Sequence, residues 1–303
     1  MTGRAEGATE PLVTVIIPTH NRRELLERAV GSVRRQTHRA MEIIVADDAS
    51  SDGTADAVRE WIAEDTRIRY VRREENIGAA TIRNVALAVA TGRYVCFLDD
   101  DDEWLPEKVA TQIPLADRYS IVGCRSRRVD GFEVLGVATA RRRERQGSGR
   151  LIEVGLDDIF FNNGRLSPSC IMVTTERLRQ VGGFDENLVS SQGRDLFVRL
   201  VEAFGPAVLL DSYLAAHHQR HGLVRITTTR KNLVGGWAEL DKHWHLMSPS
   251  LRAWRTFVLC LKEADLAPTY PAQMGWIARS LLYVRPRRLG SYIKTFARKV
   301  FVR

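Results

Sequence analysis

The sequence predicts an α/β protein with a Rossmann-like, mostly parallel sheet flanked by helices and a helical C-terminal extension. Short apolar runs alternate with segments of helical periodicity up to about residue 105, which is typical of a doubly wound sheet. Polar loops follow three of these apolar runs. After about residue 231 only helical patterns remain.

The first repeating unit starts at Val13–Ile17, an all-apolar run of the kind that is buried on both faces of a parallel sheet. A helix is expected from Glu24, with Asn21 as its N-cap, because apolar residues then recur at steps of three and four. A second strand at Glu42–Ala46 and a helix at Thr54–Ile62, beginning with a hydroxyl cap, repeat the unit.

The alternation continues with a strand at Ile68–Val71 and a helix at Ala79–Ala90, for which Gly92 is the expected C′ glycine. A fourth strand is expected at Tyr94–Leu98. Residues 125–150 are basic and are expected to form a mobile loop or hairpin. The remaining predicted elements are a helix at Glu107–Ala116, a strand at Ser120–Cys124, a strand at Ser167–Thr174, a helix at Thr175–Val181, a turn at Gly182–Asp185, a helix at Leu196–Ala203 and a strand at Val208–Leu214.

The chain length of 303 residues and its 44% hydrophobic content suit one large domain and a smaller appendage. We expect a flexible N-terminus at 1–11, a main domain at 12–230 with halves 12–105 and 106–230, and a helical extension at 231–303. The tryptophan-rich helices of this extension would form a small core or the contact of a homodimer.

Cysteine usage and charge indicate a location. The four cysteines lie far apart without CxxC spacing, and no run of 18 apolar residues occurs, so we expect a cytoplasmic protein that does not span a membrane. Residues 285–303 hold seven Lys or Arg and no acid, interleaved with apolar residues, which suits an anionic membrane surface. The alternative is a solvated helix face.

Four adjacent carboxylates, Asp99–Asp102, follow the fourth predicted strand. Like charges at this spacing oppose each other's ionisation unless a cation is near, and oxygen ligands favour magnesium or manganese. If the strand continues, Asp99 and Asp101 point the same way, and both are candidate metal ligands. The alternative is that these acids cap a helix beginning near Leu105-Pro106.

Two further groups of polar residues are candidate ligand-binding sites, and each also has a simpler structural explanation. Asp48 and Asp52 belong to a loop after the second strand, where an Asx turn is the competing explanation. His217, His218 and His221 follow a predicted strand, and His221 is a candidate ligand for metal or phosphate, with a polar strand end as the alternative. The glycine motifs of dinucleotide-binding and P-loop proteins are missing from the strand–helix turns.

Taken together, the order and spacing of several motifs resemble family 2 glycosyltransferases. The resemblance extends through the segments that begin at Gly182 and Asp195, and so covers about residues 12–230. The motifs that carry it are Val13–Arg22, Ile43–Thr54, Asn76–Gly78, Gly92–Pro106, Gly182–Glu186 and Asp195–Leu200.

This resemblance implies a GT-A fold and transfer of a sugar from a nucleoside diphosphate, with inversion and with Mn²⁺ or Mg²⁺ as cofactor. Residues 12–105 would be the nucleotide-sugar-binding half and 106–230 the acceptor half. It implies that Asp99 and Asp101 are the two acids of a DxD motif, with Asp101 the most direct metal ligand. His221 is a candidate metal ligand only through its position after a predicted strand. The implied nucleotide-sugar-binding residues are Pro18, Thr19, Asn21, Asp48, Arg83, Asp99 and Asp100.

The general base departs from the family pattern. The family usually places it two residues before the position of Asp195, and that place is Gly193 here, with Arg194 where an aromatic residue is common. Asp195 is therefore the candidate base, with Asp185 as another acid that could reach the site. The competing explanation for Asp195 is a carboxylate at a helix N-terminus.

The leading hypothesis is an inverting transferase acting on a glycan, lipid-linked or other hydroxyl acceptor in cell-surface polysaccharide or glycoconjugate synthesis. UDP-sugars are the favoured donors, and the inner face of the plasma membrane is an expected location. One rival is a nucleotide-sugar-binding protein with impaired catalysis, motivated by Gly193. A nucleic-acid partner is not expected, because the formal charge of +8 comes without any recognised RNA- or DNA-binding pattern.

Overall fold

The computed structural model describes residues 10–130, 147–219 and 230–284. The chain divides into two compact units. The first comprises Met1–Glu153, Arg165–Phe184 and Arg199–His221, and the second comprises Val154–Gly164, Asp185–Val198 and Gly222–Arg303.

A single mixed sheet forms the framework of the first unit. Within the described residues, nine strands join in the order β3-β2-β1-β4-β8-β6-β9-β5, with β7 paired to β9. The strands are β1 (Val13–Thr19), β2 (Met41–Asp48), β3 (Ile68–Arg73), β4 (Tyr94–Phe97), β5 (Asp102–Trp104), β6 (Val122–Asp130), β7 (Leu151–Val154), β8 (Ile171–Thr174) and β9 (Ala207–Gln219).

The N-terminal part of the sheet has the predicted parallel arrangement. Strand β1 lies between β2 and β4, with Val13 opposite both Met41 and Tyr94. The chain builds outward from β1 to β3 and then returns to β4, so the strand order reverses between β1 and β4. Ligands of such sheets bind beyond the carboxyl ends of the strands at this reversal. Strand β8 runs antiparallel to β4, which makes the whole sheet mixed.

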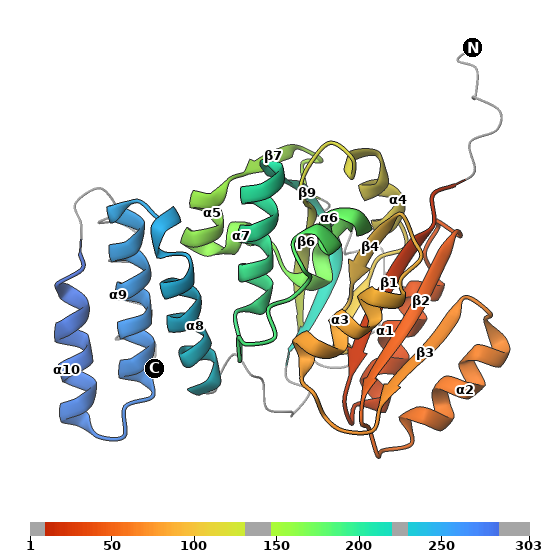
Figure 1. Cartoon of the computed structure of the whole chain (residues 1–303), viewed down its shortest axis with the longest axis horizontal. Coiled ribbons are helices and arrows are strands. Elements are labelled where there is room, and N and C mark those ends of the chain that lie inside the picture. Colours follow the sequence, from red (N-terminus) through yellow and green to blue (C-terminus); the bar gives the residue numbers. More distant parts are fainter. Residues whose placement is uncertain (1–9, 131–146, 220–229, 285–303) are drawn as a thin grey trace, which may run out of the picture. The chain divides into compact units, whose positions relative to one another are not determined.

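Three helices make the connections between the parallel strands. They are α1 (Arg23–Arg34), α2 (Thr54–Glu64) and α3 (Ala79–Val89), and α3 packs against β1 and β2 (Figure 1). Strands β1 and β2 are buried along their whole length, because helices and neighbouring strands cover both faces. The predicted strand–helix alternation is confirmed in this part of the chain.

The predicted caps of α1 and α2 are wrong, and the N-cap of α2 is Gly53, which has no hydroxyl to cap with. Asn21 has a left-handed backbone with φ of 52°, and the N-cap of α1 is Arg22, without a side-chain cap. The backbone N–H of Arg23 instead donates to Asp52 Oδ2 at 2.9 Å. Asp52 Oδ1 accepts from the N–H of Thr54 at 3.2 Å, so one carboxylate serves the starts of both helices. The loop after β2 thereby fixes the start of α1, a contact that local sequence does not reveal.

Gly92 does not act as the expected left-handed C′ residue. Helix α3 ends through Ala90, whose backbone is extended at φ −64° and ψ 133°. A Cβ on Gly92 would lie 2.5 Å from the backbone nitrogen of Thr14. Glycine is needed here for close approach of two chain segments rather than for a helix end.

The acidic run also has a different backbone from the one expected. Strand β4 ends at Phe97, and the N–H of Asp102 donates to the carbonyl of Asp99 at 3.0 Å, so Asp99–Asp102 forms a turn. The chain then enters β5, a strand that the sequence did not predict, and Asp102 pairs with His217 of β9. Asp99 and Asp101 are therefore not alternate residues of one strand, and the acids do not cap the next helix, α4 (Lys108–Gln112).

The later helices and strands are of the predicted kind, but their bounds differ from the predicted ones. Helix α4 is shorter than predicted because a 3₁₀ turn at Ile113–Leu115, containing a proline, follows it. Strand β8 starts at Ile171, after a 3₁₀ turn at Pro168–Cys170. Strand β6 extends to Asp130, into the segment predicted as a loop, and 131–146 lies outside the described residues. The short helix α6 (Thr175–Gln180) is confirmed.

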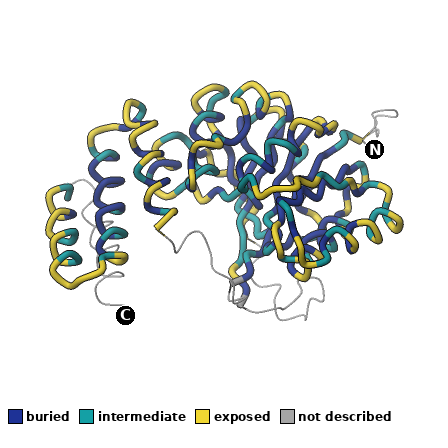
Figure 2. Tube along the Cα trace, turned by 60° about the horizontal axis from the view of Figure 1, so that its bottom comes forward, coloured by how far each residue is buried: buried dark blue, intermediate teal, exposed yellow. Residues whose placement is uncertain are grey.

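The described part of the second unit is mainly helical, as the sequence predicted after residue 231. Its largest helix, α9, begins at a Ser248 cap with Pro249 in the first turn, and most of the helix is buried (Figure 2). Its buried residues Trp254, Phe257 and Leu261 form a small core. None of the helices in the described ranges is long and apolar enough to cross a membrane. The helices are α5 (Leu156–Asn162), the start of α7 (Gln192–Phe204), α8 (Arg230–Lys242), α9 (Pro249–Asp265) and α10 (Tyr270–Leu281).

Candidate functional site

Asp48 ends β2 and anchors the loop that precedes α3. Its two carboxylate oxygens accept hydrogen bonds from the backbone N–H groups of Ile77, at 2.7 Å, and Gly78, at 2.9 Å. The backbone carbonyl of Asp48 lies 2.5 Å from Nδ1 of His20. Asp48 therefore joins the ends of β1 and β2 to the loop before α3, on the edge where the sequence placed the site.

The loops after β1 and β2 hold each other in strained conformations. Asn21 and Ala49 both have positive φ angles, 52° and 65°. The N–H of Asn21 donates to Ser50 Oγ at 2.9 Å, and Asn21 Oδ1 accepts from the N–H of Ser51 at 2.7 Å. Left-handed backbone at residues other than glycine persists only where surrounding contacts enforce it, and such strain clusters at functional sites.

Asp100 is a buried anchor of the acidic turn. Its carboxylate accepts from Thr19 Oγ1 at 2.9 Å and from Arg22 Nη1 at 3.1 Å. Burial raises the pKa of Asp100 to about 6, with Arg22 opposing and Asp101 adding to the rise. The side chain thus ties the acidic turn to the end of β1. Pro18, which directly precedes Thr19, pairs with Ala46 of β2 at the same edge.

Asp99 carries an arginine partner. Arg83 of α3 donates to Asp99 Oδ1 at 2.6 Å, and its guanidinium lies 5.4 Å from the ring centre of Phe184. The Asp99 side chain is 34% exposed, whereas that of Arg83 is 10% exposed. The backbone N–H of Asp99 donates to Ser169 Oγ at 3.1 Å. Arg83 is therefore held beside the acidic turn.

Asp101 lies between cationic side chains. Its carboxylate is 3.7 Å from Arg22 Nη1, and its backbone carbonyl accepts from Arg28 Nη2 at 3.0 Å. Burial lowers the pKa of Arg28, although Glu103 and Asp101 oppose this. Arg22 and Arg28 were not predicted as site residues, because their partners lie far along the chain. Their positions just after β1 and within α1 were the available signal.

His217 belongs to the surroundings of the acidic turn and lies within β9 rather than after it. Its Nε2 is 3.5 Å from Asp102 Oδ2, which also accepts from Ser169 Oγ at 2.6 Å. Burial opposes protonation of His217, but Cys170, Asp99 and Asp101 raise its pKa overall. His218 points to a different partner, Glu103, at 3.3 Å. The candidate ligand His221 lies outside the described residues.

The acidic turn fits a metal that takes few protein ligands. In 10–130, 147–219 and 230–284, no three His, Cys, Asp or Glu side chains converge as a metal site. Magnesium commonly binds one or two carboxylates and completes its shell with water and phosphate. Asp101 and Asp99 are partly exposed oxygen donors of this type. Because Asp99 is bound to Arg83, the Asp101 carboxylate fits direct ligation better.

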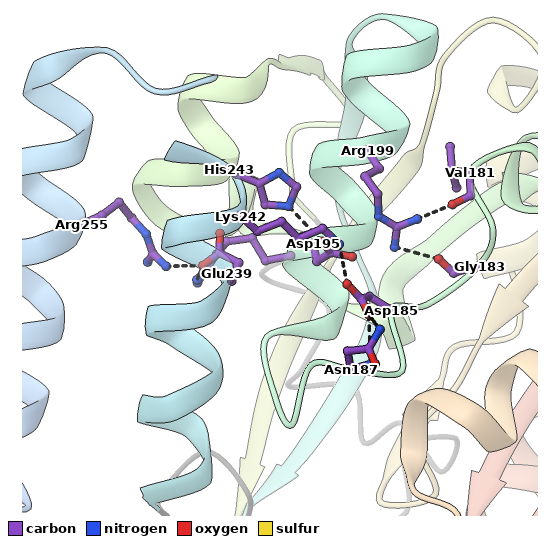
Figure 3. A network of polar contacts seen from close by, with 11 residues as sticks. Val181, Gly183, Asp185, Asn187, Asp195, Arg199, Glu239, Lys242, His243 and Arg255 are labelled. Atoms are coloured by element: carbon purple, nitrogen blue, oxygen red, sulfur yellow. Dashed lines mark hydrogen bonds and ion pairs between the residues drawn. The ribbon is translucent and has the colours of Figure 1, made fainter. Parts of the chain in front are cut away.

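Asp195 occupies the centre of a charged cluster in the second unit (Figure 3). Its carboxylate has no exposed surface and lies 2.6 Å from Lys242 Nζ and 2.9 Å from His243 Nε2. Lys242 also pairs with Asp185 at 2.5 Å, which lowers the pKa of Asp185. Asp185, the alternative acid of the sequence analysis, is thus part of the same cluster.

A second ion-pair group packs beside helix α8. The buried carboxylate of Glu239 lies 3.1 Å from Arg194 Nη1 and 2.5 Å from Arg255 Nη2. Burial lowers the pKa of Arg255 to about 10. Arg194, which stands where the family commonly has an aromatic residue, is therefore held by Glu239. Both charged groups join α7 to α8.

Fold and site together define an α/β protein whose candidate ligand-binding edge lies beyond the carboxyl ends of β1, β2 and β4 and combines acidic with arginine side chains. Residues 14–172, just over half of the chain, match the family model Glycosyl transferase family 2, and the chain belongs to this family.

Several curated relatives are glycosyltransferases. The chain is 48% identical over 104 residues to the putative teichuronic acid biosynthesis glycosyltransferase TuaG of Bacillus subtilis, covering 34% of this chain and 41% of that protein. It is 26% identical to the putative colanic acid biosynthesis glycosyl transferase WcaA of Escherichia coli, over 82% of this chain and 87% of WcaA. The match to TuaG therefore spans less than half of that relative.

Solved structures show the same fold. S. aureus TarS 1-349 superposes with a TM-score of 0.66 at 20% identity, over 95% of this chain and 87% of that one. Mannosyltransferase PcManGT from Pyrobaculum calidifontis, in complex with GDP-Man and Mn²⁺, has a TM-score of 0.58 at 20% identity, over 97% and 88% of the two chains. The fold of this chain is accordingly the GT-A fold, as expected from the sequence.

Proposed function

We propose that this protein is an inverting, metal-dependent glycosyltransferase that moves a sugar from a nucleoside-diphosphate sugar to an acceptor hydroxyl. The observation that carries the proposal is the convergence of Asp48, Asp99 and Asp101 on the strand-end edge of a family 2 chain. A nucleoside diphosphate needs polar contacts for its base and cationic neutralisation for its phosphates, and this edge offers both.

The donor would lie against the loops after β1, β2 and β4. Arg83, placed by Asp99, would approach the anionic diphosphate with a fixed guanidinium. Asp101, with Asp99, would hold Mn²⁺ or Mg²⁺, and the bound metal would stabilise negative charge on the leaving diphosphate. The further proposed donor-binding residues are Pro18, Thr19, Asn21, Asp48 and Asp100. His221 remains a proposed additional ligand.

Inversion requires a base for the acceptor hydroxyl, and Asp195 is the proposed source of that basicity. Its carboxylate is covered by His243 and Lys242, so we assign the role to Asp195 together with His243. The carboxylate would orient the imidazole, which would take the proton, as in other carboxylate–histidine pairs. Gly193 at the usual position brings no carboxylate of its own.

The acceptor is proposed to be a glycan or lipid-linked hydroxyl in cell-surface polysaccharide or glycoconjugate synthesis. TuaG and WcaA are named for polysaccharide synthesis, and Escherichia coli WfgD, 40% identical over 110 residues, is named for transfer from UDP-Glc to a diphosphoundecaprenol-linked sugar. A TarS structure holds UDP-GlcNAc. These names favour a UDP-sugar donor and a membrane-linked acceptor.

A cytoplasmic location at the inner face of the plasma membrane follows from this proposal. The sequence of 285–303, with seven basic residues and no acid, would supply attraction to anionic lipids. A homodimer through the helical extension is a separate proposal, which sedimentation of the purified chain tests.

The test is a panel of UDP-, GDP- and dTDP-sugars with Mg²⁺ or Mn²⁺, scored by nucleotide release with and without glycan acceptors. We expect release from one donor class, dependent on metal. The rival is a nucleotide-sugar-binding protein with impaired catalysis. Metal-dependent UDP binding without release from any donor would support that rival and contradict transfer.

A further inference from the structure

Helix α10 exposes a continuous apolar face. Tyr270, Met274 and Leu281 recur at helical spacing on this face, and Leu282 directly follows the helix. Tyr270 and Leu282 are each 72% exposed, Leu281 55% and Met274 44%. The residues between them on the exposed side are Pro271, Gly275, Ala278 and Arg279. Arg279 is the single charge of this helix.

The opposite side of α10 is accounted for by its neighbour. Helix α10 packs against α9, whose own residues are largely buried (Figure 2). Ser280 is the one buried residue of α10 in the described structure. Because α10 already packs one face against α9, its fold does not require large apolar side chains on the opposite, exposed face. The exposed apolar face therefore requires a separate explanation.

Charge narrows the choice of partner. From residue 266 to the end, the sequence contains eight Lys or Arg and no acidic residue. Arg279 lies with its guanidinium 5.1 Å from the ring centre of Trp276, at the border of the apolar face. Apolar and aromatic groups flanked by Arg279 and followed in the sequence by cationic residues match a bilayer with anionic headgroups. A second copy of the same segment would instead bring like charges together.

We propose that the exposed face of α10, formed by Tyr270, Met274, Leu281 and Leu282, inserts into the headgroup region of an anionic membrane. These side chains enter the interface, and Arg279 contacts lipid phosphates. The proposal deepens the proposed function, on which it rests for its purpose, because it names a described surface that would bring the protein to membrane-linked acceptors. The surface itself is independent of catalysis.

Vesicle binding of the full-length protein tests this, without donor or metal. Vesicles of phosphatidylcholine with phosphatidylglycerol should sediment the wild-type protein, and phosphatidylcholine vesicles alone should bind it less. The double variant Met274→Glu/Leu281→Glu should weaken binding to the anionic vesicles about tenfold or more, since acids replace inserted apolar groups. Leu282→Gln, a milder change at an exposed site, should weaken it by a smaller factor.

Val234→Glu is the matched control, because Val234 on α8 has nearly the same exposed fraction, 54%, as Leu281. It should bind vesicles as the wild type does. Unchanged binding by the α10 variants would overturn the proposal. If the α10 variants lose self-association but keep vesicle binding, the proposal is also overturned, and the face is assigned to a second copy. Failure of nucleotide release affects the proposed transfer alone, because the vesicle assay contains no donor.

Discussion

Asp195, in the first turn of α7, and Lys242, the last residue of α8, form an ion pair of 2.6 Å in which the carboxylate is fully buried. A buried carboxylate without its cation is strongly destabilising, although Lys242 itself is 35% exposed and partly screened by solvent. The pair is therefore both a structural link between two helices and a constraint on any catalytic role of Asp195.

We expect Lys242→Met to lower the free energy of unfolding by about 1–2 kcal/mol at neutral pH. Because Lys242 lowers the pKa of Asp185, the stabilisation is present above the ordinary carboxyl pKa and is lost as pH falls through the lowered value. The loss in the variant should thus shrink in acid. Thermal unfolding from pH 7 down to pH 3 measures this, and Lys231→Met, an exposed change on α8, should show no such trend.

Asp195→Asn should lower turnover by about 10²–10⁴-fold while leaving donor binding nearly unchanged, because the amide cannot hold a protonated imidazole. His243→Gln should cause a comparable loss if the two residues act together, and both should change the pH profile of turnover. Single-turnover kinetics over a pH series measure this. Near-wild-type rates in the Asp195 variant would move the search for the base elsewhere.

Asp101→Asn should reduce metal-dependent turnover by about 10³-fold, because the charge at the leaving diphosphate would lose its cation. Metal-dependent UDP binding by calorimetry should weaken in parallel, and the far-ultraviolet circular dichroism spectrum should stay the same. Asp56→Asn, at an exposed site on α2, is the control and should keep full activity. Full activity in the Asp101 variant would remove the proposed ligand.

Gly92→Ala should destabilise the protein by about 1–3 kcal/mol, because the new Cβ would meet the backbone of Thr14 at 2.5 Å. Gly275→Ala on α10 is the matched comparison, since a Cβ there meets nothing within 4 Å. That change should be neutral or stabilise the helix by up to about 1 kcal/mol. Equal effects of the two variants in chemical denaturation would contradict the close-approach explanation.

Much of the first unit was predictable because its signals are local. Apolar runs such as Val13–Ile17 and the helical period of Ala79–Ala90 each lie within one element, and both elements were confirmed. The order of these elements then places Asp48 and Asp99 at one edge, because parallel strands end on the same side. The position of the proposed donor-binding edge follows from topology alone.

The errors have a common physical cause. Asn21 was not a cap because Asp52, from another loop, takes that role. Strand β5 escaped prediction because it is three residues long and depends on pairing with β9, more than 100 positions later. Short elements of this kind gain their stability from partners distant in sequence, and local propensity does not report those partners.

The sequence by itself determined the family resemblance, the alternating fold and the edge at which the acidic residues gather, since these depend on residue order and periodicity. Only the tertiary structure decided how buried each acid is and which cationic or hydroxyl side chain it contacts. It buried Asp100 against Thr19 and Arg22, bound Asp99 to Arg83, and enclosed Asp195 between Lys242 and His243. Four adjacent carboxylates are alike in sequence, and burial and charged neighbours from distant segments make them different.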